Sequence, residues 1–524
     1  MGNDLKIWLI VRSGKKLPIN YVLAVDAGTS SVRCLVVDLN GHLVSLCRRE
    51  WGYQSSDDIG FSSVEFDPEA FWCIIGECIA GALKDAGISG RAIVGVSATS
   101  QREGVVFLDK DGNELYAGPN IDIRALTEGI SIDSEFSNEI YSITGHTPSF
   151  LFVPAKLRWF ETNRPEIYDR IATILTISDW IIYRLCGELV SEACGASELG
   201  LVDIKDRKWS NRLKDLLTLP DGIYPELVPA GSQVGRVTPQ AAVETGILAR
   251  TPVVQGAPDT HCGLMGMGVK EKGQVGIVLG WSAPVQMVTD KPILDPEGKI
   301  WASCYPLPDK WILESNAGEA GNAYRWLKEM MFGQDELLKE EPYGLMDDLA
   351  LAAPAGAEEV LAFVGPSVMN MGHLTLDFGG FLFPLPLSVT NIHRAHLVRA
   401  ALENLCFAIK ANCLQLEVIS TMKIQEVVIG GGMTRSRCLA QILPAVLGMP
   451  VYVSEIAEVS GLGAAMCAAV GSGTYSSLEE GMKAMTSPLR IIEPDSLLTL
   501  EYTEYYQRWT STAKWLKKLS EEMK

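Results

Sequence analysis

The chain opens with short apolar runs separated by polar turns. Residues 21–25, 32–39 and 43–47 are rich in apolar and β-branched side chains, and each run predicts a buried strand. The join between the first two runs reads Asp26-Ala27-Gly28-Thr29-Ser30-Ser31. One turn between two strands therefore carries a carboxylate, a glycine and three hydroxyl groups.

A similar pattern returns about 250 residues later in the chain. A predicted strand at 252–255 leads into glycine-rich turns, and runs at 276–279 and 284–288 flank Gly280-Trp281-Ser282. The two segments share the order of strands and turns but few identical residues. It suggests two similar α/β domains facing across a cleft, each bringing one turn to the same ligand.

Other segments complete this alternation of strands and helices. Strands are predicted at 92–98 and 105–108, and helical stretches from about 155 to 187. The segment VVIGGGMTRSRCLAQIL predicts a strand, a glycine turn and a helix, an arrangement that lets a phosphate or nucleotide approach. The C-terminal segment 501–524 has the pattern of an amphipathic helix packed on the second domain.

One stretch, 459–478, runs 20 residues without a charge. Its glycine, alanine and serine content favours a buried, closely packed helix and its exit turn. A transmembrane span is the alternative interpretation.

Composition narrows the class of protein. A length of 524 residues predicts two large domains. A formal net charge of −19 argues against a nucleic-acid partner and against an anionic membrane surface. Twelve scattered cysteines without a CxxC pair indicate a cytoplasmic chain without disulfides. Residues 1–20 hold only a five-residue apolar run, which predicts an N-terminal arm and no signal sequence.

The first turn carries the groups that bind phosphate. Gly28 allows a ligand close to the backbone, and hydroxyl and N–H groups follow in a row at Thr29, Ser30 and Ser31. Asp26 is placed to hold a divalent metal, directly or through water, and Arg33 adds a cation. A hydrogen-bonded polar turn without a ligand is the alternative.

Seven segments together resemble the FGGY carbohydrate kinases, members of the actin/Hsp70/sugar-kinase fold. In chain order they are DAGTSSVR, SQREGVV, NIDIRA, KLRWFETN, GAPDTHCGLMGMG, HLVRAALE, and GGMTRSRCLAQIL with SGLGAA. The resemblance extends from about residue 21 to about residue 515, in the family's order. Within the family, SQREG, NIDIRA and SDWIIYRLCGEL look most like autoinducer-2 kinase and related sugar kinases.

The resemblance implies an α/β chain of two ribonuclease-H-like domains facing across a cleft. The first domain would span 21–268 and the second 269–524, behind an arm at 1–20. The implied reaction is phosphorylation of a hydroxyl on a small sugar or polyol, with ATP and Mg²⁺ in the cleft. Homodimers are common in this fold, so a homodimer is the prior expectation.

Asp259 matches the family's catalytic aspartate. A carboxylate there would accept the acceptor's proton, and general base catalysis typically contributes ~10²–10⁴ in rate. Together with Asp26 it would also hold Mg²⁺. From the residues alone, an aspartate that caps the next helix stays open.

The resemblance assigns further positions to the two substrates. The expected acceptor-binding residues, besides Asp259, are Gln101, Arg102, Glu103 and Asp122. The expected ATP-binding residues are Thr29, Ser30, Ser31, Arg33, Gly280, Gly431 and Gly432. A solvated surface pair remains the alternative for Arg102 and Glu103, and a structural ion pair for Asp122 with Arg124.

The chain departs from the family pattern at several positions. Trp281 stands where a threonine usually faces the γ-phosphate, and Pro384 replaces a glycine of the second signature, whose spacer to His396 is longer than usual. Leu151 and Thr260 replace a tyrosine and a glutamine of glycerol kinase, which disfavours glycerol as the acceptor.

Three alternatives follow. The chain could act on another ketose or polyol, such as xylulose or glycerol. It could be a non-catalytic member that senses sugar or nucleotide, which Trp281 motivates. It could be an actin- or Hsp70-like ATPase, although those folds lack an acceptor loop such as SQREG.

Overall fold

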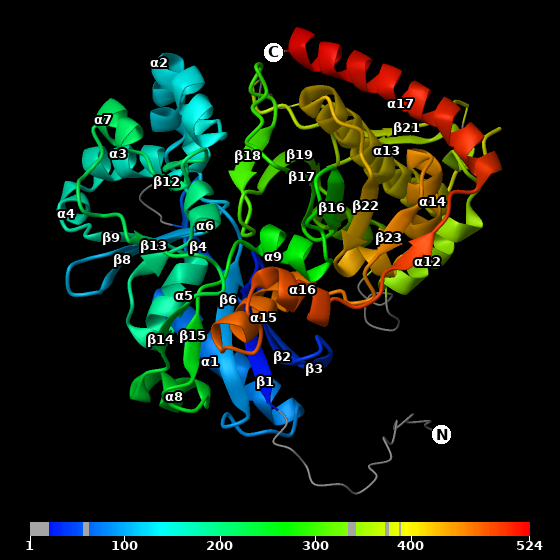
Figure 1. The fold of residues 1–524 in the computed structure, drawn as a ribbon. Coiled ribbons are helices and arrows are strands. Elements are labelled where there is room, and N and C mark those ends of the chain that lie inside the picture. Colours follow the sequence, from blue (N-terminus) through cyan, green and yellow to red (C-terminus); the bar gives the residue numbers. More distant parts are fainter. Residues whose placement is uncertain (1–19, 56–61, 334–341, 373–376, 387–388, 524) are drawn as a thin grey trace, which may run out of the picture.

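The computed structural model describes residues 20–55, 62–333, 342–372, 377–386 and 389–523. The predicted arm at 1–20 lies outside these ranges except for its last residue. Two domains, each built around a mixed sheet with helices on its faces, lie side by side (Figure 1).

The first domain contains a six-stranded sheet in the order β14-β15-β6-β1-β2-β3. Its central strand β1 pairs antiparallel with β2 and parallel with β6, which in turn pairs parallel with β15. The strands are β1 (Tyr21–Ala27), β2 (Ser31–Asp38), β3 (Leu43–Glu50), β6 (Ile93–Ser100), β14 (Gln233–Arg236) and β15 (Pro252–Val254).

The second domain contains a seven-stranded sheet in the order β18-β19-β17-β16-β22-β23-β24. β16 pairs antiparallel with β17 and parallel with β22, so this sheet repeats the pattern of the first. The strands are β16 (Gln274–Val278), β17 (Ser282–Thr289), β18 (Trp301–Cys304), β19 (Trp311–Glu319), β22 (Glu426–Gly430), β23 (Val451–Val453) and β24 (Arg490–Ile492). The shared topology confirms the predicted pair of ribonuclease-H-like domains.

A smaller sheet in the order β8-β7-β9 extends the first domain. It is formed by β7 (Val105–Leu108), β8 (Glu114–Gly118) and β9 (Thr173–Thr176). The helical stretches predicted from about 155 to 187 are present as α3, α4 and α5, but the prediction missed β9, where Ile174 and Leu175 are buried and pair with β7. A four-residue run between helices is too short to show a strand period, and only its pairing partner makes it a strand.

Helices cover both domains. Those of the first domain are α1 (Pro68–Asp85), α2 (Leu126–Thr144), α3 (Val153–Asn163), α4 (Pro165–Tyr168), α5 (Ile177–Cys186), α6 (Ala193–Ser197), α7 (Asn211–Leu217) and α8 (Pro239–Thr245). α9 (Asp259–Gly266) follows the last strand of the first sheet. Those of the second domain are α10 (Gly321–Met331), α12 (Pro342–Ala352), α13 (Arg394–Ser420), α14 (Arg437–Leu447), α15 (Val459–Gly471), α16 (Leu478–Met485) and α17 (Ser496–Glu522).

Helices α9 and α15 pack against each other between the two sheets. α15, from the uncharged stretch 459–478, packs on α9 and on strands β1 and β6 of the first domain (Figure 1). A Cβ on Gly463 would lie 1.9 Å from the carbonyl oxygen of Cys262, so glycine is required for this approach. The predicted buried helix with an exit turn is confirmed, and no helix in the described ranges is long and apolar enough to cross a membrane.

The C-terminal helix α17 runs along the outside of the second domain (Figure 1). Its Trp509 donates a hydrogen bond from Nε1 to Oδ1 of Asn404 on α13, at 2.9 Å. The Tyr502 hydroxyl lies 2.6 Å from Nη2 of Arg399 and 2.9 Å from Oε1 of Glu403, both also on α13. The helix is therefore part of the second domain, as its sequence pattern predicts.

Candidate active site

A cleft of about 1670 Å³ opens between the two sheets. The β1–β2 turn, the loop after β6, the start of α9, the β16–β17 turn and the loop after β22 all contribute to its wall. Most of the predicted site residues line it, namely Asp26, Thr29, Ser30, Ser31, Arg33, Gln101, Arg102, Glu103, Asp259, Gly280 and Gly432. Segments more than 200 residues apart thus meet at one site, as the paired pattern of turns predicts.

Two predicted residues do not reach the wall of the cleft. Asp122 is buried, and its carboxylate accepts hydrogen bonds from Tyr116, from Arg124 Nε at 2.8 Å and from the Val64 N–H at 3.0 Å. This is the structural ion pair that the sequence left open. Gly431 has φ +101, and a Cβ on it would lie 2.6 Å from the carbonyl oxygen of Leu279. Glycine is therefore needed at position 431 because the backbone of Leu279 lies so close, and no ligand is required to explain it.

The β1–β2 turn is held in shape from outside. The Gly28 N–H donates to the carbonyl of Ser31 at 3.1 Å, and the Trp51 indole N–H donates to the carbonyl of Gly28 at 2.9 Å. The Tyr53 hydroxyl donates to the carbonyl of Thr29. These bonds engage the carbonyls of the turn, while Thr29, Ser30 and Ser31 line the cleft.

Asp26 lies on β1 at the floor of this turn and is nearly fully buried. Nη1 of Arg33 lies 3.3 Å from its Oδ2, and Nε of Arg33 lies 3.3 Å from Oε2 of Glu458. Burial raises the pKa of Asp26, while the charge of Arg33 opposes that rise. A further cation at this position would therefore be favourable.

The β16–β17 turn of the second domain lines the same cleft as the β1–β2 turn of the first domain. Gly280 lines the cleft, and no atom of the described residues lies within 4 Å of where a Cβ would stand, so a ligand can come close to its backbone. The Trp281 side chain is 40% exposed and also lines the cleft. The indole replaces a hydroxyl at this point but leaves the backbone open.

Asp259 is the first residue of α9, and Pro258 takes the N-cap position. Its Oδ1 accepts a hydrogen bond from the N–H of Thr260 at 2.7 Å. Asp259 is half-buried at the cleft wall, so part of its carboxylate stays open. Burial, and then the negative charge of Asp26, raise its pKa from 3.8 to about 7, and Arg102 opposes the rise. A carboxylate with this pKa suits a general base near neutral pH.

The loop after β6 presents Arg102 and Glu103 to the cleft beside Asp259. The Gly104 N–H donates to the carbonyl of Arg102 at 2.7 Å, and Glu103 within this tight turn has φ +58. Positive φ at a non-glycine residue is costly and is typical of functional sites. Burial raises the pKa of Glu103 to about 8, with Arg102 opposing and the nearby Glu198 adding to it.

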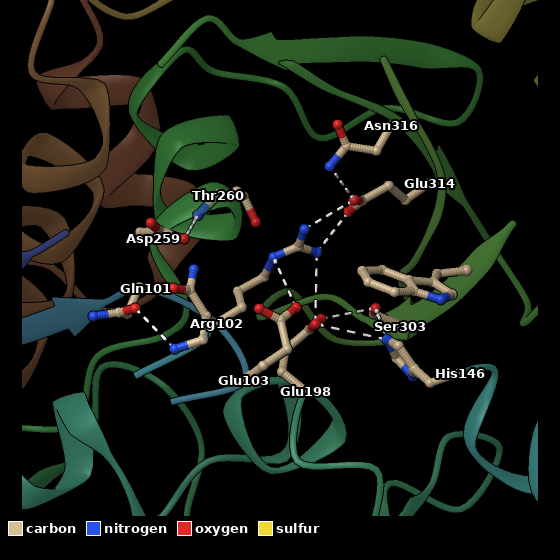
Figure 2. Close-up of polar contacts among 12 residues, drawn as sticks. Gln101, Arg102, Glu103, His146, Glu198, Asp259, Thr260, Ser303, Glu314 and Asn316 are labelled. Atoms are coloured by element: carbon tan, nitrogen blue, oxygen red, sulfur yellow. Dashed lines mark hydrogen bonds and ion pairs between the residues drawn. The ribbon is translucent and has the colours of Figure 1, made fainter. Parts of the chain in front are cut away.

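Figure 2 shows the Arg102 guanidinium between Glu314 on one side and Glu103 and Glu198 on the other. Nη1 and Nη2 of Arg102 donate to Oε2 and Oε1 of Glu314 at 2.7 and 2.9 Å. Nη1 also lies 3.5 Å from Oε2 of Glu198. Arg102 is therefore a buried, multiply paired cation, and the surface pair that its sequence left open is wrong.

Gln101 holds loops together. Its Oε1 accepts from the N–H of Asn120 at 3.1 Å, and its Nε2 donates to the Tyr53 hydroxyl at 3.3 Å. Asn120 in turn donates from Nδ2 to Oγ1 of Thr29 at 3.3 Å. The phosphate-type turn and the Arg102 loop are thus one connected unit.

The sequence did not reveal several residues of the site. Glu198 follows α6 and Glu314 lies on β19, each an isolated acid with no motif around it. Trp301 on β18 lies with its ring 5.6 Å from Cζ of Arg102. Asn120 could have been found, because it begins the segment NIDIRA that carries the resemblance.

The acidic residues at the cleft fit one divalent ion. Among the residues that the structure describes, no group of three or more His, Cys, Asp or Glu gathers as a metal site. Mg²⁺ needs no such cluster, because it keeps waters and takes one or two carboxylates plus substrate phosphates. Asp26 and Asp259 face the same cleft, and the charge of Asp26 raises the pKa of Asp259. A bound Mg²⁺ would relieve that repulsion.

Comparison with known proteins agrees with this geometry. Residues 21–266 match the model of the N-terminal domain of the FGGY family of carbohydrate kinases, and residues 275–472 match that of the C-terminal domain. The chain is 32% identical over 498 residues to an autoinducer-2 kinase from Yersinia enterocolitica, covering 93% of this chain and 92% of that one. It is 33% identical over 471 residues to one from Yersinia pseudotuberculosis, covering 88% of each.

Solved structures agree on the fold. The xylulose kinase from Rhodospirillum rubrum has a TM-score of 0.81 and 26% identity, covering 96% of this chain and 100% of that one. The glycerol kinase from Plasmodium falciparum with ADP has a TM-score of 0.79 at 18% identity, covering 94% of this chain and 98% of that one, and supports the fold alone.

A two-domain chain of this fold, with phosphate-type turns facing an aspartate across a cleft, is a phosphotransferase of the sugar-kinase class. This chain belongs to the FGGY family of carbohydrate kinases. It is a kinase that phosphorylates a hydroxyl of a small sugar with ATP. The sensing and chaperone-like alternatives are not favoured.

Proposed function

We propose that Asp259 is the general base of this kinase. The observation that carries the proposal is its position, with a carboxylate open to the cleft between the β1–β2 turn and Arg102. Its pKa of about 7 leaves a large fraction ionised at neutral pH, yet keeps it basic enough to take a proton.

The other cleft residues divide between the two substrates. Thr29, Ser30, Ser31 and Arg33 bind the terminal phosphates of ATP, and Gly280 and Gly432 leave room for the nucleotide. Arg102 and Glu103 bind acceptor hydroxyls, and Gln101 holds their loop in place. Asp26 and Asp259 hold Mg²⁺, which neutralises phosphate charge when bound. We assign neither Asp122 nor Gly431 to a substrate, because neither lines the cleft.

In the transfer step, the acceptor oxygen attacks the γ-phosphorus in line. The bond from that phosphorus to the bridging oxygen of ADP breaks as the new P–O bond forms. The acceptor proton passes to the Asp259 carboxylate. The remaining site residues bind, orient and exclude water.

We propose autoinducer-2, or a small ketose like it, as the acceptor. The curated relatives at 32% and 33% identity are named for autoinducer-2, and the SQREG and NIDIRA segments point the same way. Xylulose is the second candidate, because a xylulose kinase at 26% identity shares the fold over 96% of this chain. Leu151 and Thr260 disfavour glycerol.

The test is ADP release with Mg·ATP across a panel of autoinducer-2 precursor, ketoses and polyols. We expect the highest kcat/KM with the autoinducer-2 precursor. A clear preference for xylulose would select the second candidate. No acceptor-dependent ADP release from any of them would contradict the proposed acceptor class.

We also propose a cytoplasmic enzyme with a domain boundary at 268/269. All twelve cysteines are free, which suits a reducing compartment. The proposed boundary falls between the two family matches, at 21–266 and 275–472. The homodimer stays a prediction, for which light scattering of the purified chain is the direct measurement.

A further inference from the structure

Arg102, which we propose as an acceptor-binding residue, is held from the opposite domain. Its guanidinium makes two parallel hydrogen bonds to Glu314 on β19, at 2.7 and 2.9 Å, across 212 residues of sequence. Two-point pairing of this kind fixes the plane of the guanidinium as well as its position. The orientation of a first-domain residue is thus determined by the second domain.

Glu314 is itself rigidly placed. Its side chain is fully buried, and Nε2 of Gln286 on β17 donates to its Oε2 at 2.8 Å. Nδ2 of Asn316, on the same strand, lies 3.3 Å from its Oε1. Figure 2 shows Asn316 and Arg102 reaching Glu314 from different sides. Both carboxylate oxygens of Glu314 are thus hydrogen-bonded and the side chain is shielded from solvent, so a change of its conformation would break these bonds and leave a buried charge unpaired.

The other side of the guanidinium is anchored more loosely. Oε2 of Glu198 lies 3.5 Å from Nη1, and Oε1 of Glu103 lies 3.8 Å from Nε. Ser303 donates to Oε1 of Glu198 at 2.9 Å, so Glu198 is also tied to β18 of the second domain. Among the residues that the structure describes, no hydrogen bond reaches Oε1 of Glu103 or Oε2 of Glu198, although Oε2 of Glu198 also lies 3.6 Å from Nε2 of His146. The contacts on this side are longer than the two bonds to Glu314, so Glu314 holds the guanidinium more tightly.

We propose that Glu314 is a positioning residue for the acceptor, which fixes Arg102 through the two-point bond across the cleft. The proposal rests on the proposed function, in which Arg102 binds acceptor hydroxyls. It adds that the acceptor site is completed only when the second domain contributes β19. Glu314 acts through Arg102 and has no direct role in the transfer of phosphate.

The competing explanation is that the pair only stabilises the interface of the two domains. The two explanations differ in kinetics. Loss of a positioning residue raises the KM for the acceptor and spares the KM for ATP, whereas general loosening affects both substrates or only stability. The variant Glu314→Gln keeps the shape of the side chain and removes its charge.

We expect Glu314→Gln to raise the acceptor KM about 10- to 100-fold, the range for one charged hydrogen-bonded pair, with the ATP KM within about twofold. Glu403→Gln is the matched control. Glu403 is a buried partner of Arg399, at 2.9 Å, and it does not line the cleft. It should lower stability and leave both KM values near those of the wild type.

A double variant tests the route of the effect. If Glu314 acts through Arg102, then Glu314→Gln adds little to the acceptor KM once Arg102→Met is present, because the two effects are not additive. Should Glu314→Gln fail to fold, Glu314→Asp replaces it. This variant keeps the charge but is one carbon shorter, and its acceptor KM should lie between those of wild type and Glu314→Gln.

The outcomes are distinct. Three results would overturn the proposal: an unchanged acceptor KM in the folded Glu314 variant, equal rises in both KM values, or full additivity with Arg102→Met. If the wild type turns over the acceptor, the kinase function is unaffected by these results. A wild type with no acceptor-dependent turnover would overturn both. A selective rise that vanishes in the Arg102→Met background supports Glu314 as the positioning residue.

Discussion

At the scale of single residues, the site depends on carboxylates that are costly to ionise. Asp259, Asp26 and Glu103 face one cleft, and burial raises the pKa of each. Arg33 and Arg102 offset part of that cost through direct pairing. Perturbed acids that surround an open space are typical of catalytic sites.

The pKa of Asp259 predicts the pH dependence of the reaction. The base must be ionised, so kcat/KM should rise with pH, bend near the pKa of about 7 and then level off. The measurement is initial rate at low acceptor concentration across a pH series. A profile that is flat down to the ordinary value of 3.8 would contradict a base with a raised pKa.

The same shift predicts a gain in stability when the charge is removed. The folded chain keeps the Asp259 proton up to about pH 7, whereas the unfolded chain loses it near 3.8. Ionisation of Asp259 therefore destabilises the folded chain. Below pH 3.8 this cost is absent, and it grows as the pH rises from 3.8 to about 7. We expect Asp259→Asn to raise the free energy of unfolding by ~1–3 kcal/mol above that pH. Denaturant unfolding checks this, and a gain that is the same at all pH values would refute the cause.

At the scale of elements, the sequence predicted those site residues that belong to a continuous local motif. The turn at 26–33 and the start of α9 are continuous motifs, so their residues could be assigned in advance. Glu314 and Glu198 could not, because each matters only through Arg102, which lies far away in sequence. Asp122 shows the reverse case, since a motif residue near the loop proved to be buried among Tyr116 and Arg124.

The crossing of α9 and α15 predicts a strong local constraint. The Cβ of Gly463→Ala would lie 1.9 Å from the carbonyl oxygen of Cys262, a backbone atom that cannot move alone. We expect a loss of about 1–3 kcal/mol or more in the free energy of unfolding. Gly52→Ala is the control, because Gly52 is exposed and no atom of the described ranges lies within 4 Å of its Cβ position. Equal unfolding midpoints for the two variants would show that the helices can separate freely.

At the scale of the whole molecule, the two domains meet at one cleft, where we propose that ATP, Mg²⁺ and the acceptor bind. A ligand that binds only the folded chain stabilises it by mass action, by ~2.7 kcal/mol at a hundredfold excess over Kd. We expect Mg·ATP to raise the Tm, and a chelator to remove most of that rise and all acceptor-dependent ADP release. Asp26→Asn should need more Mg²⁺ for the same Tm. A Tm rise with ATP that a chelator leaves unchanged would contradict the metal assignment.

The central claim is that Asp259 takes the acceptor proton while the cleft holds ATP beside it. The most direct test is the single-turnover rate of acceptor phosphorylation in wild type and Asp259→Asn, with ATP affinity measured on both. A fall of ~10²–10⁴ in the rate at saturating Mg·ATP is the predicted result. A variant that transfers phosphate at the wild-type rate would show that another group, or none, is the base.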